Sequence, residues 1–134
     1  MEQKREGEWT FDGSVAQEFC DHARKHIPDY EKIIGLCVRI AEKRLRPDAK
    51  ILDVGSATGY TLERFADAGF SNLFGVEASE GMISKSFQGA KLVHSNRFPK
   101  ELAPFDMVVA NWTLHFVIDE RAEYVRDVYE GLVP

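Results

Sequence analysis

The stretch Lys50–Tyr60, which reads KILDVGSATGY, constrains the fold more than any other part of the chain. Apolar residues surround Asp53 in its first half, as expected of a short strand that is covered on both faces. Gly55 and Gly59 allow a sharp turn and let a ligand approach the backbone closely. A helix that follows such a loop directs free N–H groups back toward it. The stretch therefore predicts a strand, a loop and a helix that bind a nucleotide-like ligand.

The rest of the chain alternates the hydrophobic patterns of helices and strands. Two helices are predicted first, one from Ser14 to just before Pro28 and one from Tyr30 to about residue 46. We expect strands at residues 50–54, 72–77, 90–94 and 105–111, and helices at residues 59–68, 79–87 and 119–130. This order predicts the α/β class, with a Rossmann-like, doubly wound parallel sheet of strand order 3-2-1-4.

Residues 1–134 should form one domain, in which residues 1–47 are an N-terminal helical cap and residues 48–134 the sheet core. We expect Asp29 and Ser79 to cap the helices that follow them and Gly69 to end the helix before it. Trp9 and Phe11 are expected either to cover the pocket or to anchor the N-terminal tail. The last helix is followed by only a few residues, whereas an open parallel sheet usually continues. The sequence is therefore expected to be a C-terminally truncated fragment.

Three kinds of ligand loop can be compared with residues 53–59. A P-loop needs a lysine after its last glycine, and the dinucleotide fingerprint needs G-x-G-x-x-G; the sequence has neither. What remains is the pattern Asp53-x-Gly55-x-Ala57-x-Gly59, with Glu77 at the end of the second predicted strand. A carboxylate there can bind both hydroxyls of a ribose. The pattern favours an adenosine-bearing ligand without a phosphate, and S-adenosylmethionine is the obvious one. The alternative is that the glycines only turn the chain.

Composition excludes several other classes of function. The net charge is −5 and the pI is near 5.4, which argues against a nucleic-acid partner because such surfaces need clustered Lys and Arg. No apolar run approaches the roughly 18 residues of a transmembrane helix, so no membrane partner is expected. Cys20 and Cys37 lack metal-site or redox spacing and are expected to be reduced thiols, which indicates the cytoplasm.

Residues 51–59, 75–82 and 105–116 resemble the motifs of class I S-adenosylmethionine-dependent methyltransferases. The resemblance implies a seven-stranded family sheet, of which this chain holds four strands. It also implies S-adenosylmethionine as cofactor, S-adenosylhomocysteine as product, and methyl transfer to an unidentified, small-molecule acceptor. A second possibility is a truncated domain that binds the cofactor without catalysis.

Residues 9–16, 27–30 and 111–114 resemble, more closely, the carboxy-S-adenosylmethionine synthases, which modify the cofactor itself. In that branch the residues at positions matching Tyr30, 55–57, 77–78 and Asn111 contact the cofactor. The branch also uses a later arginine to hold the added carboxylate, and that region is absent here. This activity is therefore the alternative to methyl transfer.

Two positions depart from the methyltransferase pattern. Ala57 replaces the middle glycine of the motif, and His94-Ser95-Asn96 replaces the Gly-Asp pair whose carboxylate receives the adenine amino group. Ser95 or Asn96 could supply an oxygen acceptor there. The predicted cofactor-binding set is Tyr30, Asp53, Gly55, Ser56, Ala57, Gly59, Glu77, Ala78, Ser95, Asn96, Asn111 and Trp112.

His115 is the candidate catalytic base, because it follows a strand whose carboxyl end should lie at the ligand. The alternative is a structural loop histidine. His22 and His26 are four residues apart on one helix, but no carboxylate or cysteine motif accompanies them, so no metal site is predicted. The fourth strand should form an exposed apolar edge, which predicts self-association through this strand or its adjacent helix.

Overall fold

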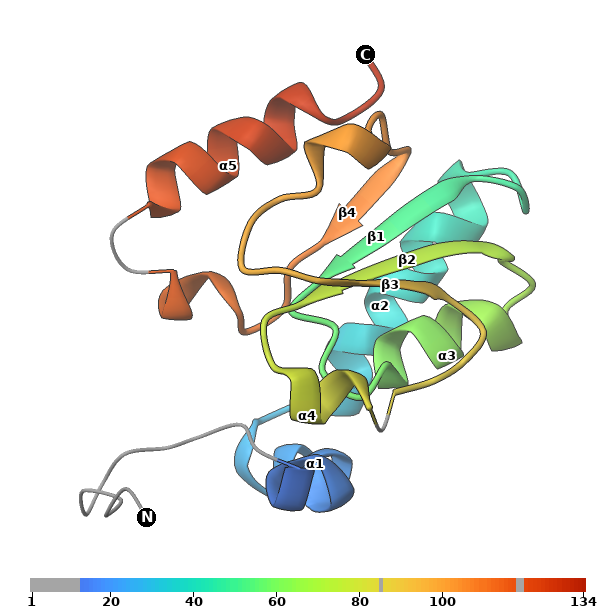
Figure 1. Ribbon diagram of the computed structural model, residues 1–134. Helices are drawn as coiled ribbons and strands as arrows, with labels where there is room; N and C mark the ends of the chain where they lie inside the picture. Colours follow the sequence, from blue (N-terminus) through green and yellow to red (C-terminus); the bar gives the residue numbers. More distant parts are fainter. Residues whose placement is uncertain (1–12, 85, 118–119) are drawn as a thin grey trace.

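The computed structural model describes residues 13–84, 86–117 and 120–134 (Figure 1). The expectation for Trp9 and Phe11 lies outside these residues. No helix in the described part of the chain combines the length and the hydrophobicity needed to cross a membrane.

Four parallel strands form one sheet, in the order β3-β2-β1-β4. They are β1 (Lys50–Val54), β2 (Asn72–Glu77), β3 (Lys91–His94) and β4 (Met107–Val109). The predicted fold class and strand order are thus confirmed. The fourth strand is shorter than predicted at both ends: Phe105 instead makes an isolated bridge to Leu132, and the chain turns away at Trp112, whose φ is 53°.

Helices cover both faces of the sheet, because its strands are apolar on both sides. On one face, α2 (Tyr30–Arg44) and α3 (Tyr60–Asp67) pack against the sheet. On the other face, α5 (Arg121–Glu130) and the 3₁₀ helix η1 (Lys100–Leu102) cover the sheet. The two cores are each built around large buried side chains; these are Val38, Leu62, Phe65 and Phe70 on the first face, and Phe74, Phe98, Phe105 and Tyr124 on the second.

The first helix, α1 (Gly13–His26), lies beyond the carboxyl ends of the strands, near the short helix α4 (Glu80–Ile83) (Figure 1). For α4 the sequence predicts a longer helix, which reaches residue 87, and this prediction is wrong. The reason is that the N–H of Phe87 donates to the carbonyl of Thr58 at 3.0 Å, so the segment is tied to the glycine loop instead of continuing the helix.

The helix ends follow the sequence at two of three predicted positions. Ser79 caps α4 by accepting the N–H of Met82, and Gly69, at φ 98°, ends α3. Asp29 precedes α2 as predicted, but its side chain makes no capping hydrogen bond. Its backbone is left-handed, with φ 56°, and its carboxylate pairs with Lys32 at 3.3 Å instead.

Candidate functional site

A cavity of about 500 Å³ opens at the carboxyl ends of β1 and β2 and at the loop after β4, with α1 forming its outer wall. This is where open α/β sheets bind ligands. The structure places almost all predicted site residues in the lining: Tyr30, Asp53, Gly55, Ser56, Ala57, Glu77, Ala78, Ser95, Asn96, Asn111, Trp112 and His115. Gly59 is the exception. It lies behind the loop, where a Cβ would meet Ser86 and Phe87 at less than 3.0 Å.

The loop after β1 is hydrogen-bonded to the end of the neighbouring strand β2. The N–H groups of Gly55 and Ser56 both donate to the carbonyl of Val76, at 2.8 and 3.2 Å. Gly55 has φ 68°, and a Cβ there would lie 1.9 Å from the hydroxyl oxygen of Thr113. Ser56 is 4% exposed, and its hydroxyl has no hydrogen-bond partner among the described residues. The hydroxyl is shielded from solvent and packs against Gly75 of β2, where an added Cβ would lie 2.8 Å from it, so it holds the loop close to β2.

Glu77, the last residue of β2, holds this loop in place by two hydrogen bonds. One carboxylate oxygen accepts the N–H of Ala57 at 2.9 Å, and the other accepts the N–H of Ser79 at 2.8 Å. An ionised carboxylate has about four acceptor positions, so two further hydrogen bonds can be accepted from the cavity side. Glu77 can therefore hold the loop and a pair of ligand hydroxyls together.

Asp53 lies at the bottom of the cavity, with 4% of its surface exposed. Its burial, and to a lesser degree the nearby carboxylate of Glu77, raise the pKa of Asp53 to about 8. At neutral pH the side chain is therefore mostly protonated. A cation bound nearby would restore its charge, so the cavity favours a positively charged group at this position.

An aromatic wall faces these carboxylates. The ring of Tyr30 lies 5.2 Å from that of Trp112 and 6.1 Å from that of Tyr60. Tyr30 is 7% exposed, and burial raises the pKa of its phenol above the usual range. The two interpretations of Tyr30, core packing and contact with a ligand, are both compatible with this position, because the ring is buried and also lines the cavity.

The polar residues after β3 and β4 complete the lining. The Asn111 amide donates to the sulfur of Cys37 on α2 at 3.6 Å, which leaves its carbonyl oxygen available. The Ser95 hydroxyl accepts the N–H of Arg97 at 3.0 Å and can still donate its own hydrogen.

The outer wall is the part of the site that the sequence analysis missed. α1 contributes Phe19, His22, Ala23 and His26 to the cavity, and Ile27 follows directly after the helix. Their spacing of three or four residues marks one helix face, and that signal was present in the sequence. Nothing in the sequence indicates, however, that this face lies over the cavity.

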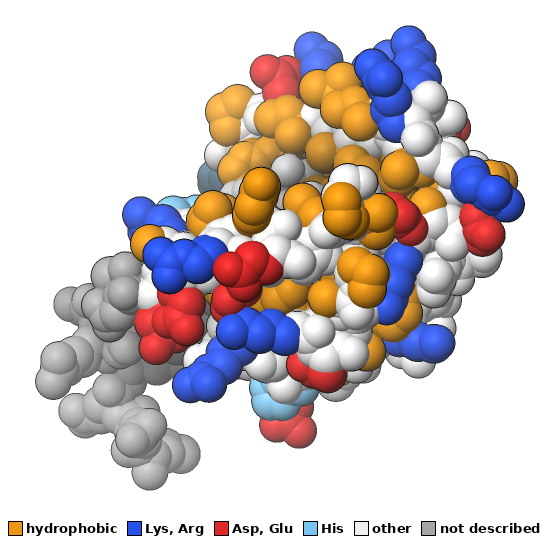
Figure 2. Space-filling view, turned by 90° about the horizontal axis from the view of Figure 1, so that it is seen from above, with side chains coloured by type: hydrophobic (Ala, Val, Ile, Leu, Met, Phe, Trp, Pro, Cys, Tyr) orange, Lys and Arg blue, Asp and Glu red, His pale blue; other side chains and the backbone are white. Residues whose placement is uncertain are grey.

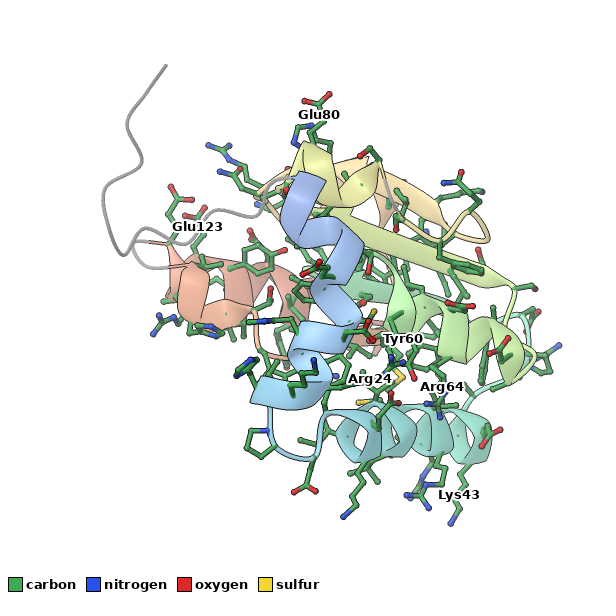
Figure 3. The ribbon with its side chains drawn as sticks, turned by 90° about the horizontal axis from the view of Figure 1, so that it is seen from below. Arg24, Lys43, Tyr60, Arg64, Glu80 and Glu123 are labelled. Carbon is green, nitrogen blue, oxygen red and sulfur yellow. The ribbon has the colours of Figure 1, made fainter. Side chains whose placement is uncertain are left out.

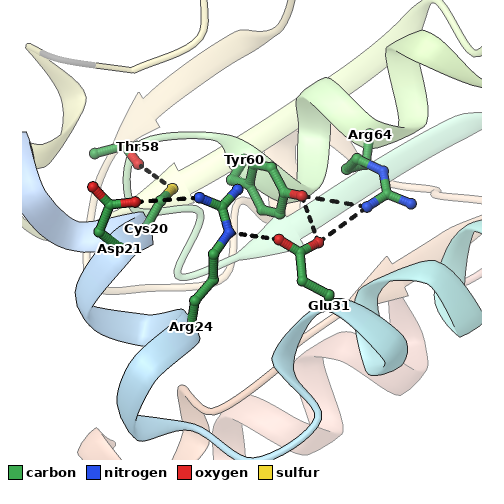
Figure 4. Close-up of polar contacts among 7 residues, drawn as sticks. All are labelled: Cys20, Asp21, Arg24, Glu31, Thr58, Tyr60 and Arg64. Carbon is green, nitrogen blue, oxygen red and sulfur yellow. Dashed lines mark hydrogen bonds and ion pairs between the residues drawn. The ribbon is translucent and has the colours of Figure 1, made fainter.

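Four side chains fix α1 to the rest of the domain (Figures 3 and 4). Glu31 of α2 accepts hydrogen bonds from Arg24 of α1 at 2.6 Å, from the Tyr60 hydroxyl at 2.5 Å and from Arg64 at 3.2 Å. These bonds, led by that of Tyr60, hold the pKa of Glu31 below its usual value. The Arg24 guanidinium also lies 5.0 Å from the centre of the Tyr60 ring. The network joins three helices at one end of the cavity.

The histidines lie at the mouth of the cavity. His115 is exposed, lines the cavity and belongs to the 3₁₀ helix η2 (Leu114–Phe116). The rings of His22 and His26 are 4.2 Å apart. Among the described residues, no three His, Cys, Asp or Glu side chains gather closely enough to hold a metal ion.

Replacing Ala57 by glycine is expected to raise the free energy of unfolding by up to about 1 kcal/mol. Ala57 has φ 50°, a conformation in which a Cβ is strained and glycine is not. Urea unfolding measures the change. The matched control is Ala66→Gly in α3, which should lower stability by about 1 kcal/mol because a helical glycine is unfavourable. A loss of stability at both positions would contradict the left-handed backbone at residue 57.

Comparison with known proteins gives three kinds of match. A family model described as a methyltransferase domain matches residues 52–134. The carboxy-S-adenosyl-L-methionine synthase of Campylobacter fetus is 32% identical over 134 residues, which cover 93% of this chain and 57% of that protein. The corresponding synthase of Yersinia enterocolitica is 30% identical, over 96% of this chain and 53% of that protein. The chain thus spans little more than half the length of these curated relatives.

Solved structures share the fold at low sequence identity. The sugar N-methyltransferase KedS8 from Streptoalloteichus superposes with a TM-score of 0.71 and 23% identity, over 99% of this chain and 54% of that one. The plantazolicin methyltransferase BpumL, solved with S-adenosylhomocysteine, has a TM-score of 0.67 and 14% identity, over 90% of this chain and 54% of that one.

Proposed function

The chain belongs to the family of methyltransferase domains, and from this membership and the geometry of its cavity we propose that it binds S-adenosylmethionine and transfers the methyl group to a small-molecule acceptor. The observation that carries the proposal is the arrangement at the strand ends. One cavity is lined by the glycine loop, the buried Asp53 and Glu77. The carboxylate of Glu77 accepts two backbone N–H groups and has acceptor positions left for a ligand. The sequence motifs had already indicated membership of a methyltransferase family.

The residues present fit this cofactor. Glu77 has acceptor positions for the two ribose hydroxyls, and Asp53 suits a group with positive charge. Ser95 and Asn96 supply acceptors for the adenine, and the Asn111 carbonyl is available to an ammonium group. Gly59 contributes the shape of the loop and no contact.

The sulfonium supplies an activated methyl group when the cofactor is bound. The chain's own contribution is to hold the two reactants in line and to keep water away from them. Tyr30 and Trp112 provide an apolar wall for this purpose, and Phe19 and Ala23 of α1 pack in the same cluster. His115 is proposed as the base that takes a proton from the acceptor, since it lies at the mouth where the acceptor enters.

Calorimetric titration of the whole chain with S-adenosylmethionine, S-adenosylhomocysteine and NAD tests this function. We expect both sulfur ligands to bind and NAD not to bind. Binding of NAD alone would overturn the proposal. Binding of the sulfur ligands without turnover over an acceptor panel would favour a cofactor-binding domain without catalysis.

Replacing Glu77 by glutamine is expected to weaken the binding of S-adenosylmethionine about 100-fold. The amide loses the charge that strengthens hydrogen bonds to the ribose, and its NH₂ group faces a backbone N–H. The same calorimetric titration measures the change. The control is Glu80→Gln, which removes an exposed carboxylate of α4 that does not line the cavity. Equal affinities for the two variants would exclude Glu77 from ribose binding.

A second candidate function is that of the curated relatives, the synthesis of carboxy-S-adenosylmethionine. Sequence identity over most of this chain favours it, whereas the likeness covers little more than half of those proteins. Mass spectrometry of the bound ligand after purification separates the two candidates, because a carboxylated sulfonium differs in mass from S-adenosylmethionine.

We also propose self-association along the free side of the sheet. β4 is an edge strand among the described residues, although Phe105 pairs with Leu132 just before it. Exposed apolar side chains flank this edge on two helices: Ile33, Leu36 and Ile40 on α2, and Val125 and Tyr129 on α5. Figure 2 shows hydrophobic side chains spread over one face, with lysines and arginines mostly toward its margins.

Sedimentation of the chain is therefore expected to depend on its concentration. Tyr129→Lys should shift the protein toward the monomer, because Tyr129 is 80% exposed and a charge there opposes burial. Gln88→Lys adds the same charge at an exposed loop position and is the control. A monomer at every concentration would refute this interface.

The proposed place of action is the cytoplasm, and no nucleic-acid partner is proposed. Cys20 and Cys37 are unpaired, and each contacts a different polar group, Thr58 and Asn111 respectively. Such thiols are typical of reducing compartments. The net charge of −5 opposes binding to a phosphate backbone.

A further inference from the structure

Glu31 of α2 joins two walls of the cavity, although it is not one of the residues that line it. One of its carboxylate oxygens accepts a hydrogen bond from Arg24 at 2.6 Å. The other accepts the hydroxyl of Tyr60 at 2.5 Å and Arg64 at 3.2 Å (Figure 4). Arg24 belongs to α1 and Tyr60 is the first residue of α3, so one side chain ties two neighbouring helices together.

Tyr60 carries this connection to the aromatic wall. It lines the cavity and directly follows Gly59 of the glycine loop. Its ring is stacked on that of Tyr30, at 6.1 Å between ring centres and 19° between ring planes, and Tyr30 in turn lies 5.2 Å from Trp112. The Tyr60 ring cannot swing away from Tyr30 without breaking its hydrogen bond to Glu31. The carboxylate therefore holds the wall in the shape that faces a ligand.

Arg24 carries the connection to α1. The preceding residue, Ala23, is 2% exposed, and both Ala23 and Phe19 line the cavity and pack in the cluster that includes the aromatic wall. α1 also reaches the glycine loop, where the sulfur of Cys20 lies 3.7 Å from the hydroxyl oxygen of Thr58. A shift of α1 would thus change the apolar lining and the loop together.

We propose that Glu31 is a positioning residue for the cofactor, which keeps α1 docked on the cavity and Tyr60 in the aromatic wall. The inference rests on the proposed binding of S-adenosylmethionine and adds a residue that does not touch the ligand. A ligand that contacts the cavity walls favours the docked position of α1. By thermodynamic linkage, the docked position then strengthens binding of the ligand by the same factor.

Hydrogen exchange of the whole chain tests the docking of α1, because exchange reports local opening. Saturating S-adenosylhomocysteine should slow exchange of the α1 amides about tenfold in the native chain. Glu31→Gln should speed exchange of these amides about tenfold in the ligand-free chain, while the amides of β1 and β2 stay unchanged. Unchanged exchange of α1 in the variant would overturn the proposal. An equal increase in the strands would also overturn it, because Glu31 would then stabilise the whole fold.

Calorimetric titration with S-adenosylhomocysteine tests the effect on binding. Glu31→Gln should weaken binding about tenfold and Arg24→Gln about threefold, since both side chains are partly exposed to solvent. The double variant should bind no more weakly than Glu31→Gln, because Arg24 acts through Glu31. A double variant about thirtyfold weaker, the product of the two effects, would overturn the proposal by showing that the two residues act independently.

Glu42→Gln is the matched control, because it makes the same substitution at an exposed position of α2 that does not line the cavity. It should bind the ligand as the native chain does, and weaker binding by this control would refute a specific role of Glu31. The native chain is titrated first. Absence of binding there refutes the proposed function and this inference with it, whereas native binding with unchanged affinity in Glu31→Gln refutes the inference alone.

Discussion

Gly55→Ala is expected to lower the free energy of unfolding by about 3 kcal/mol and to abolish cofactor binding. Two costs combine at this position. The backbone has φ 68°, which strains any residue with a Cβ, and the added Cβ would lie 1.9 Å from the Thr113 hydroxyl oxygen and 2.8 Å from its Cβ. The loop must move away from Thr113, and the N–H groups of residues 55 and 56 then leave the carbonyl of Val76. Urea unfolding and calorimetric titration measure the two effects.

Two further variants separate strain from collision. Gly69 has φ 98°, and a Cβ added there would have no other atom within 4 Å, so Gly69→Ala should show the cost of strain alone, about 1–2 kcal/mol. Adding Thr113→Gly to Gly55→Ala removes the colliding side chain and should recover part of the stability. If the double variant is no more stable than Gly55→Ala, the collision with Thr113 contributes nothing and the backbone strain accounts for the whole loss.

The strands and the glycine loop were predictable because their signals are local. Residues 50–54 carry an apolar run bounded by a glycine turn, and the structure forms β1 over this same range. The order of the four strands also follows from rules on parallel crossovers. The closeness of Asp53 and Glu77 was also predictable, because neighbouring parallel strands end at the same edge of the sheet.

What escaped prediction depends on contacts between distant residues. The helix after Ser79 ends early because Phe87 bonds to Thr58, and no residue between 80 and 87 signals that end. The placement of α1 depends on Glu31 of α2, whose partners lie on α1 and α3. The close approach of Thr113 to Gly55 likewise joins loops from two strands.

Asp53→Asn is expected to stabilise the folded chain at alkaline pH while it weakens cofactor binding. Burial and the charge of Glu77 raise the pKa of Asp53 to about 8, whereas in the unfolded chain it is near 4. Between these values the folded state binds more protons than the unfolded state, so the free energy of unfolding falls as the pH rises from about 4 to about 8. The fall is at most about 1.4 kcal/mol for each pH unit. Asparagine resembles the protonated acid and removes this dependence.

Urea unfolding between pH 5 and pH 9 should therefore show the two proteins diverging, with the variant more stable by on the order of 3 kcal/mol at pH 8. The exposed Asp67→Asn, at the end of α3, is the control and should follow the native chain. Binding should change in the opposite direction, about 100-fold weaker, because asparagine cannot regain a negative charge beside a cationic ligand. Titration at pH 7 in buffers of different ionisation enthalpy should also show that the native chain releases a proton on binding and that the variant does not. If both proteins release a proton, the group that loses it on binding is not Asp53. If only the native chain does so, the buried carboxylate that lowers stability at high pH is also the group that recognises the positively charged cofactor.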